Sequence, residues 1–120
     1  YYHHNFLKEQ PQLNCHLPEV QEALLDVTRF WLDRGVDGFR FDAINFLMHD
    51  RALTDNPPVA NPAKRTRPFD FQHHIHNQSQ PEIALFLERL RAVIDSYGGR
   101  FALAEVGGEQ AQTEMHEYTE

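Results

Sequence analysis

Two acidic residues occupy equivalent places in the sequence, each at the end of a short apolar run. Asp42 ends the run 36–42, and Glu105 lies in the run 101–106. Paired carboxylates have a known chemical use. In retaining glycoside hydrolysis, one attacks the anomeric carbon while the other protonates the leaving oxygen and later activates water. An acid after a strand is more often a helix cap or a solvated loop residue, so spacing alone leaves that structural interpretation open.

Arg40 favours the chemical interpretation, because it lies two residues before Asp42. Side chains two apart on an extended strand share a face. A guanidinium there would lower the pKa of Asp42 and keep this carboxyl ionised as a nucleophile. Glu105 has Leu103 and Val106 as neighbours in sequence. If these apolar side chains also surround it in space, desolvation would favour its protonated form, as a general acid requires.

Two helices are predicted from apolar residues at helical spacing. The first covers residues 18–34 and ends at Gly35. The second covers residues 80–97, with Ser79 and Glu82 at capping-box spacing. The apolar stripe of the first helix, including a tryptophan expected in the core, comprises Val20, Ala23, Leu24, Val27, Phe30 and Trp31. The stripe of the second helix comprises Ile83, Phe86, Leu87, Leu90, Val93, Ile94 and Tyr97.

The short runs 36–42 and 101–106 are predicted as buried strands, with residues 43–80 between them forming a long βα loop. Alternation of helices and strands indicates an α/β fold with parallel strands. Two parallel strands do not complete a sheet, so we expect an incomplete folding unit. In a parallel α/β barrel, reacting groups lie at the C-terminal ends of the strands, so Asp42 and Glu105 would face a common mouth.

Composition narrows the classes of partner. The 120 residues carry 11 Lys and Arg against 18 Asp and Glu, for a net charge of −7. This balance disfavours nucleic acid, whose phosphates need a basic surface. No apolar stretch of about 18 residues is present that would span a membrane. The chain begins with neither Met nor a targeting segment, so we expect it to begin within a longer protein. The single Cys15 fits a reducing compartment, and we predict a cytoplasmic location.

Several histidines fall in or near the long loop, and a metal site is one interpretation of them. They are His49, His73, His74 and His76. Zinc sites need three or four ligands at defined separations. We favour solvated histidines, or ones that hydrogen-bond to sugar hydroxyls, and we predict neither a metal nor an organic cofactor. Phe46 and Phe69 in the same region are candidates for stacking on a sugar ring.

Three motifs resemble those of one enzyme family. Residues 35–42 (GVDGFRFD) are similar to the nucleophile motif G-[VA]-D-G-F-R-x-D of the α-amylase superfamily, glycoside hydrolase family thirteen. Residues 104–107 (AEVG) resemble its acid/base motif on the next strand. Residues 10–14 (QPQLN) resemble the Q-P-D-L-N segment that leaves a small domain inserted after the third strand. The motifs occur in the family's order and together span residues 10–108.

The resemblance implies a partial (β/α)₈ TIM barrel, from about the third helix through the fifth strand. Residues 1–17 would be the exit from the inserted small domain, and residues 18–120 would be an incomplete part of the catalytic barrel. The resemblance also implies that Asp42 is the nucleophile and Glu105 the general acid/base. Arg40 would hold the charge of the nucleophile.

Within the superfamily, Q-P-x-L-N and the pair Asn45-Phe46 resemble the α-glucosidase and oligo-1,6-glucosidase branch. In that branch, Val after the nucleophile goes with α-1,6 linkages, whereas Ala or Thr goes with α-1,4 linkages. The chain has Ala43 at this position. The resemblance therefore implies a retaining, exo-acting α-glucosidase acting on short α-1,4-linked glucosides such as maltose, by hydrolysis or by glucose transfer. Ala43 and Phe46 would bind substrate.

The chain also departs from the family pattern. Gln12 replaces the usual Asp of Q-P-D-L-N, which affects local packing more than chemistry. Leu17 precedes the first helix where relatives often have Asn, and an apolar N-cap costs about 1 kcal/mol. The family's third catalytic Asp and its two substrate-binding histidines have no counterpart. We expect them outside these 120 residues, so the isolated chain should be inactive.

Two alternatives remain open from the sequence. An α-1,6-specific oligo-glucosidase or a sucrose-acting relative would use the same carboxylates on another linkage. A non-catalytic relative, such as the accessory ectodomain of an amino-acid transporter, keeps this barrel without working as a hydrolase. The presence of Asp42, Arg40 and Glu105 favours an enzyme.

Overall fold

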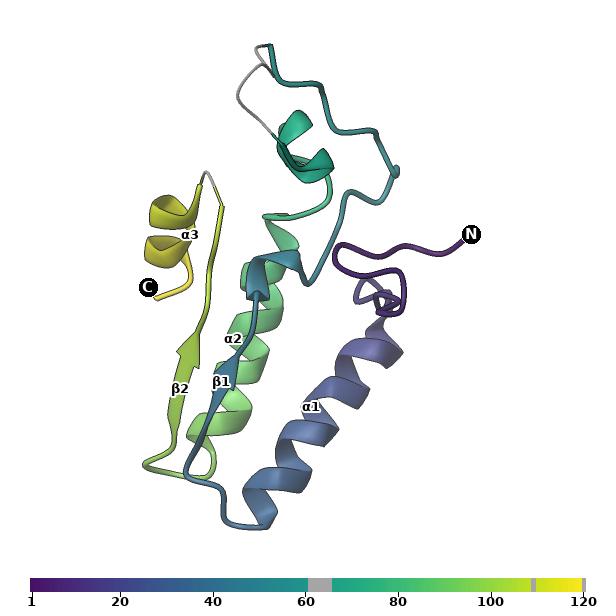
Figure 1. The fold of residues 1–120 in the computed structure, drawn as a ribbon. Helices are drawn as coiled ribbons and strands as arrows, with labels where there is room; N and C mark the ends of the chain where they lie inside the picture. Colours follow the sequence, from purple (N-terminus) through teal and green to yellow (C-terminus); the bar gives the residue numbers. More distant parts are fainter. Residues whose placement is uncertain (61–65, 109, 120) are drawn as a thin grey trace.

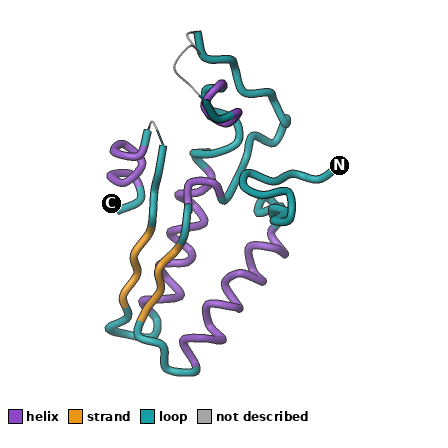
Figure 2. Tube along the Cα trace, viewed as in Figure 1, coloured by secondary structure: helices purple, strands orange, loops and turns teal. Residues whose placement is uncertain are grey.

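The computed structural model describes residues 1–60, 66–108 and 110–119. Figures 1 and 2 show two strands side by side, with two long helices that run in the opposite direction to them. Helix, strand, long loop, helix and strand follow in the predicted order, and a short third helix comes after them. The elements are α1 (Pro18–Asp33), β1 (Gly38–Phe41), α2 (Glu82–Asp95), β2 (Phe101–Ala104) and α3 (Ala111–Glu117).

The two strands pair in parallel, which confirms the predicted α/β fold with a helical crossover. Gly38 faces Phe101 in the register. A Cβ at Gly38 would lie 2.1 Å from the carbonyl oxygen of Phe101, so only glycine allows the strands to approach this closely. Both strands are shorter than the predicted runs, 36–42 and 101–106, since β1 begins two residues later and ends one earlier, and β2 ends two residues earlier. Two parallel strands with their crossover helix are consistent with part of a barrel.

The core lies between the two long helices and the strands. α1 packs against α2, and the buried face of α2 is the predicted one. Phe39 and Phe41 of β1 pack against the buried hydrophobic cluster that these helices form. The buried residues of the cluster are Cys15, Leu25, Leu32, Met48, Ile83, Phe86, Leu90 and Ile94.

The predicted buried face of α1 is wrong in part, because Val20 and Leu24 pack against the core cluster but the rest of the predicted stripe does not. α1 packs through Leu25, Thr28 and Leu32, whereas Val27 and Trp31 are 55% and 48% exposed. The helix has apolar residues on two faces, and the spacing of the sequence did not show which of them α2 covers. The second face lines an apolar cavity beside β1. Trp31 is therefore not a core residue of the described chain, and its ring meets that of Phe30 edge to face at 5.2 Å.

The observed helix ends agree only in part with the end signals predicted from the sequence. Gly35 has the left-handed φ of +85° that a residue after a helix often adopts, as predicted. Leu17 is the N-cap of α1 and makes no side-chain capping bond. The predicted capping box of α2 is wrong, because Pro81 is the N-cap and no side chain caps the helix. Ser79 instead has φ +61°, and its N–H donates to the carbonyl oxygen of Asn45 at 2.7 Å.

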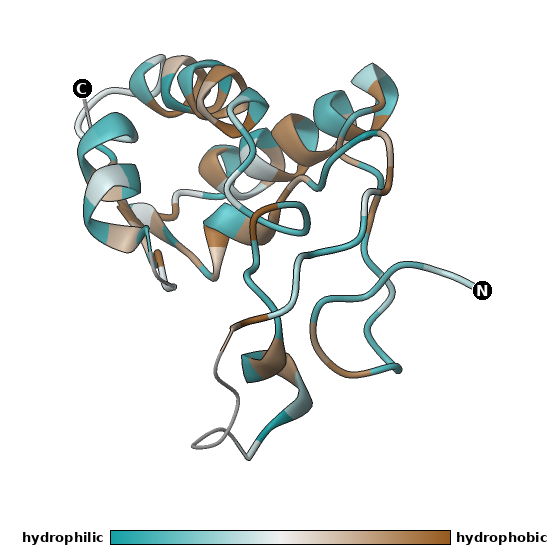
Figure 3. Ribbon diagram, turned by 90° about the horizontal axis from the view of Figure 1, so that it is seen from above, coloured by the Kyte–Doolittle hydropathy of each residue, from teal (hydrophilic) through white to brown (hydrophobic). Residues whose placement is uncertain are grey.

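The long loop and the N-terminal segment lie beyond the carboxyl ends of the strands, on one side of the fold (Figure 1). In its described part, the loop contains two short 3₁₀ turns, Ile44–Phe46 and Pro68–Phe71, and an isolated antiparallel bridge between Pro58 and Gln72. Both segments are mostly hydrophilic, whereas hydrophobic residues gather in the helices and strands (Figure 3). No helix of the described chain is long and apolar enough to cross a membrane.

Candidate active site

Asp42 and Glu105 follow directly on the paired ends of β1 and β2. Phe41 faces Ala104 in the register, so the two acids occupy the next step of the ladder. The backbone N–H of Glu105 donates to the carbonyl oxygen of Phe41 at 2.8 Å, which holds this step in place. The two acids therefore lie together at one end of the parallel pair, as the sequence predicts.

Arg40 joins the two carboxylates. Its Nη1 donates to Oδ1 of Asp42 at 2.9 Å, and its Nη2 donates to Oε2 of Glu105 at 2.7 Å. The predicted shared face of Arg40 and Asp42 is confirmed, and the link to Glu105 is an addition. A guanidinium suits this position because its planar fork presents several N–H donors at once. The three side chains form one charged cluster at the ends of the two strands.

The charges of this cluster favour an ionised Asp42. A hydrogen bond with Glu105, followed by the hydrogen bond and the charge of Arg40, lowers the pKa of Asp42 below its ordinary value. The same contacts, first of all the hydrogen bond to Asp42, raise the pKa of Arg40. Asp42 is therefore a carboxylate at neutral pH, which is the state that a nucleophile requires.

The apolar enclosure expected for Glu105 is absent from the described chain. The Glu105 side chain is 54% exposed, and Leu103 is 53% exposed. Leu103 precedes Glu105 by two residues, so both side chains leave the same side of the strand. The Glu105 side chain is therefore about half exposed, and the described chain does not enclose it in apolar side chains as the sequence suggested.

Ala43 turns the chain sharply after Asp42. It has φ +45° and ψ 47°, a left-handed conformation that costs a residue with a Cβ on the order of 1 kcal/mol. Two hydrogen bonds hold the turn, from Ile44 N–H to the carbonyl oxygen of Glu105 at 3.1 Å and from Phe46 N–H to that of Ala43 at 3.0 Å. The turn leaves Asp42 at the strand end and brings Phe46 back beside it.

Asn45 ties this turn to β2 and to the long loop, a role that sequence reasoning missed. It is completely buried, and its Nδ2 donates to the carbonyl oxygen of Gly107 at 2.7 Å. The backbone carbonyl oxygen of Asn45 accepts a hydrogen bond from the backbone N–H of Ser79. The sequence did contain a sign of this role. Asn45 is a polar residue inside the apolar run from Ile44 to Met48, and a buried amide in such a run needs specific hydrogen-bond partners.

A cavity of about 680 Å³ opens at the two carboxylates. Ala43 and Phe46, the two predicted substrate-binding residues, both line it. Phe69 does not line it, and one face of its ring is covered by His74 at 3.6 Å. The N-terminal segment supplies a wall that sequence reasoning missed. The complete lining is Phe6, Leu7, Gln10, Asp42, Ala43, Asn45, Phe46, Glu105 and Gly107.

The whole sequence of the chain matches one known protein family. The family model described as the catalytic domain of α-amylase matches residues 1–120. The chain belongs to the α-amylase family. The resemblance to this family found in the sequence motifs is thereby confirmed.

Individual relatives refine the placement within the α-amylase family. A probable α-glucosidase of Rhizobium meliloti is 52% identical over 126 residues, which cover 99% of this chain and 23% of that protein. The crystal structure of the α-glucosyl transfer enzyme XgtA superposes with a TM-score of 0.92 at 52% identity, over 99% of this chain and 23% of that one. A human amino acid transporter heavy chain is 50% identical over 58 residues, or 48% of this chain and 8% of that protein. The chain thus spans about a quarter of the first two relatives.

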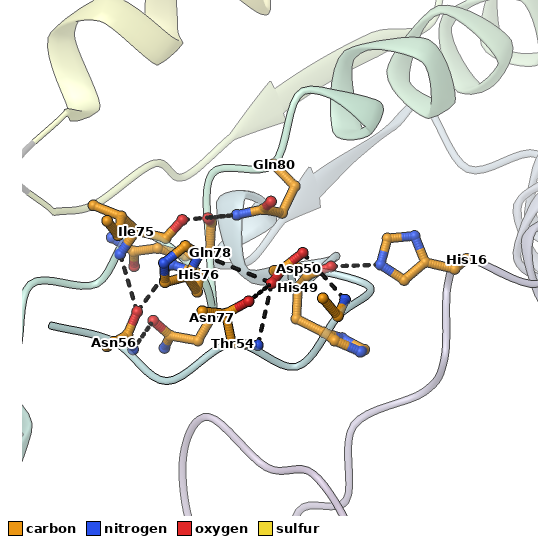
Figure 4. Close-up of polar contacts among 11 residues, drawn as sticks. His16, His49, Asp50, Thr54, Asn56, Ile75, His76, Asn77, Gln78 and Gln80 are labelled. Carbon is orange, nitrogen blue, oxygen red and sulfur yellow. Dashed lines mark hydrogen bonds and ion pairs between the residues drawn. The ribbon is translucent and has the colours of Figure 1, made fainter.

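The loop histidines of this α-amylase-family chain differ in their contacts. His74 bonds to the carbonyl oxygen of Phe69 at 2.6 Å and to Oδ1 of Asn77 at 3.0 Å. His76 lies 4.0 Å from Asp50, and Figure 4 shows both within the polar network of the loop. Burial, followed by two neighbouring histidines, lowers the pKa of His49. Among the described residues, no group of three His, Cys, Asp or Glu is placed to hold a metal ion.

Proposed function

We propose that the protein containing this chain is a retaining, exo-acting α-glucosidase that works through a covalent glycosyl-enzyme. The observation that carries the proposal is the bridge of Arg40 between Asp42 and Glu105 at the mouth of a shared cavity. The chain would form the part of the (β/α)₈ barrel from the third helix through the fifth strand. Residues 1–17 would leave the inserted small domain.

The proposed mechanism assigns one role to each charged residue. Asp42 attacks the anomeric carbon, and the bond to the leaving oxygen breaks as Glu105 gives that oxygen its proton. Glu105, now a carboxylate, removes a proton from a water molecule or another alcohol. The oxygen of that water or alcohol attacks the same carbon, and the bond between the carbon and Asp42 breaks. Arg40 keeps Asp42 ionised before the attack. Two inversions at one carbon give net retention of configuration.

The proposed substrates are short α-1,4-linked glucosides such as maltose. Ala43 lines the cavity beside the nucleophile, and in the resemblance to the α-glucosidase branch this residue goes with α-1,4 linkages. The names of the two relatives that cover the whole chain, an α-glucosidase and an α-glucosyl transfer enzyme, support both hydrolysis and transfer. We also propose a cytoplasmic location, on the ground of the single buried thiol of Cys15.

A non-catalytic role is the second candidate, favoured by the similarity to the transporter heavy chain. The discriminating observation is the cluster of Asp42, Arg40 and Glu105, because a chain without hydrolase activity has no need for this arrangement. An α-1,6-specific or sucrose-acting enzyme would share the cluster and differ in the cavity.

The test uses the full-length protein with maltose and p-nitrophenyl α-glucoside. Turnover should release glucose first as the α-anomer, which proton NMR detects before mutarotation. Asp42→Asn should abolish turnover. Asp37→Asn is the matched control, since Asp37 belongs to the same motif but is fully exposed and pairs with Arg100 at 3.1 Å. Initial release of the β-anomer, or full activity of Asp42→Asn, would refute the proposal.

A further inference from the structure

The wall of the cavity opposite the strands is made by a segment without regular structure. Phe6, Leu7 and Gln10 line the cavity together with Asp42 and Glu105. Residues 1–17, to which they belong, contain no helix or strand. The backbone hydrogen bonds of a helix or a sheet therefore do not hold this wall against the site. Side-chain contacts must do so.

Gln12 makes the contact that fastens the wall to the turn after the nucleophile. Its Nε2 donates to the carbonyl oxygen of Phe46 at 2.7 Å, and its Oε1 accepts a hydrogen bond from Nδ2 of Asn5. Its backbone N–H donates to the carbonyl oxygen of His3 at 2.9 Å. A side-chain amide can donate and accept at the same time. Gln12 uses both abilities, within the segment and across to Phe46.

The hydrogen bonds continue from Asn5 into the long loop. Nδ2 of Asn77 donates to Oδ1 of Asn5 at 2.8 Å, and Oδ1 of Asn77 accepts from Nδ2 of Asn56 at 2.8 Å. Asn56 in turn accepts the backbone N–H groups of Ile75 and His76 at 3.1 and 2.9 Å. Figure 4 shows Asn56 and Asn77 at this junction. A chain of four partly buried amides thus connects the wall to both limbs of the loop.

The aromatic rings at this wall depend on the same connection. The ring of Phe6, next to Asn5, lies 5.2 Å from the ring of Phe46 at an interplanar angle of 54°. Both rings line the cavity, and Gln12 holds the carbonyl of Phe46. The separation of these rings therefore depends on Gln12. The charged cluster, by contrast, is held by the pairing of β1 with β2.

We propose that Gln12 is a positioning residue that sets substrate affinity. It does so by holding the wall formed by Phe6, Leu7 and Gln10 against Phe46 at the site. This inference rests on the proposed function. It also gives a role to the departure from the family motif, in which Asp stands at the position of Gln12. A carboxylate only accepts hydrogen bonds and is one methylene shorter. Asp therefore cannot donate to the carbonyl of Phe46 as Gln12 does.

The first test measures kinetics of the full-length protein with maltose. Gln12→Met keeps the length of the side chain and removes both hydrogen-bonding groups, and Gln12→Asp introduces the residue of the motif. Each should raise KM about threefold to tenfold and leave kcat within about twofold, since the carboxylates stay in place. Asn77→Leu should raise KM in the same direction. The double variant Gln12→Met/Asn77→Leu should lose less than the product of the single effects, because both break one chain of bonds.

Gln21→Met is the matched control. Nε2 of Gln21 also donates to a backbone carbonyl, that of Cys15 at 2.8 Å, but Gln21 lies on α1 outside the cavity. Its KM should equal that of the parent protein. An equal rise of KM in Gln21→Met, or an unchanged KM in Gln12→Met and Gln12→Asp, would overturn the proposal.

A second measurement does not depend on turnover. Amide hydrogen exchange of residues 5–12 should be faster in Gln12→Met than in the parent protein, and unchanged in Gln21→Met. If the parent shows no α-glucosidase activity, the proposed function fails. Faster exchange in Gln12→Met would then still support the positioning role, whereas unchanged exchange would overturn it in either case.

Discussion

Arg40 donates a hydrogen bond of 2.7 Å from β1 to Glu105, the residue that directly follows β2. The parallel register produces this contact, because Arg40 faces Leu103, two residues before Glu105. Arg40 on β1 thus contacts both Asp42, at the end of its own strand, and Glu105, at the end of the neighbouring strand. The charge state of the site and the pairing of the strands therefore depend on each other.

Replacement of Arg40 should alter the pH dependence of activity. The pKa of Asp42 is held low by Glu105 and by Arg40, so removing the guanidinium raises this pKa. A larger fraction of Asp42 is then protonated at acid pH, and the acidic limb of the kcat/KM profile should move to higher pH in Arg40→Met. We also expect a loss of at least about 100-fold in kcat/KM at neutral pH.

Arg91→Met is the control for Arg40→Met, because Arg91 pairs with the exposed Asp95 on the surface of α2, away from the charged cluster. Its pH profile should match that of the parent protein. An acidic limb that stays in place in Arg40→Met would show that Arg40 does not set the ionisation of Asp42.

Glu105→Gln should separate the two steps of the reaction. The amide can neither give a proton to the leaving oxygen nor take one from water, so turnover of maltose should fall about 10²- to 10⁴-fold. A substrate with an activated leaving group, such as α-glucosyl fluoride, needs little proton donation and should lose much less in the first step. Burst kinetics would measure that step, with Glu88→Gln on the exposed side of α2 as the control. Equal losses with both substrates would argue against Glu105 as the acid.

Gly38→Ala should destabilise the protein through the contact between the strands. The new Cβ would meet the carbonyl oxygen of Phe101 at 2.1 Å, and backbone on both sides must move apart. Overpacking of this kind costs about 3 kcal/mol. Gly107→Ala adds a methyl group with nothing within 4 Å and should change stability by less than about 0.5 kcal/mol. Urea unfolding of both variants gives the comparison, and equal midpoints would contradict the close approach.

Ala43→Val should shift linkage preference toward α-1,6, as the resemblance to the α-glucosidase branch implies. The left-handed φ of +45° at this position adds a cost in stability of about 1 kcal/mol for a β-branched side chain. Ala43→Thr has the same shape and the same strain, but the resemblance places Thr with α-1,4 linkages. The ratio of kcat/KM for isomaltose and maltose should rise in the Val variant only. A rise in both variants would assign the effect to strain alone.

The sequence predicted that Asp42 and Glu105 lie together and which face of α2 is buried, but it predicted the buried face of α1 only in part. The places of Asp42 and Glu105 follow from strand ends in a parallel fold, which periodicity and motifs reveal. The bond between Arg40 and Glu105 requires the register of two strands, and no local pattern encodes that register. The predicted buried face of α1 was wrong in part because the helix is apolar on two sides, as the exposure of Trp31 shows.

The capping box at Ser79 failed for a related reason. Its spacing to Glu82 is correct, but the N–H of Ser79 is bound by the carbonyl of Asn45, far away in sequence, and its backbone is left-handed. The contacts of Gln12 are equally non-local, since its partner Phe46 lies in another segment. Sequence patterns report neighbours within one element, and these positions are decided by contacts between elements.

The central claim is that Asp42 forms a covalent bond with glucose, and one measurement tests it most directly. The full-length protein is incubated with 5-fluoro-α-glucosyl fluoride, digested and analysed by mass spectrometry for a glucosyl adduct. The adduct should be found on Asp42, should persist in Asp37→Asn and should be absent from Asp42→Asn. An adduct on a different residue, or none at all in a protein that turns over maltose, would contradict the account.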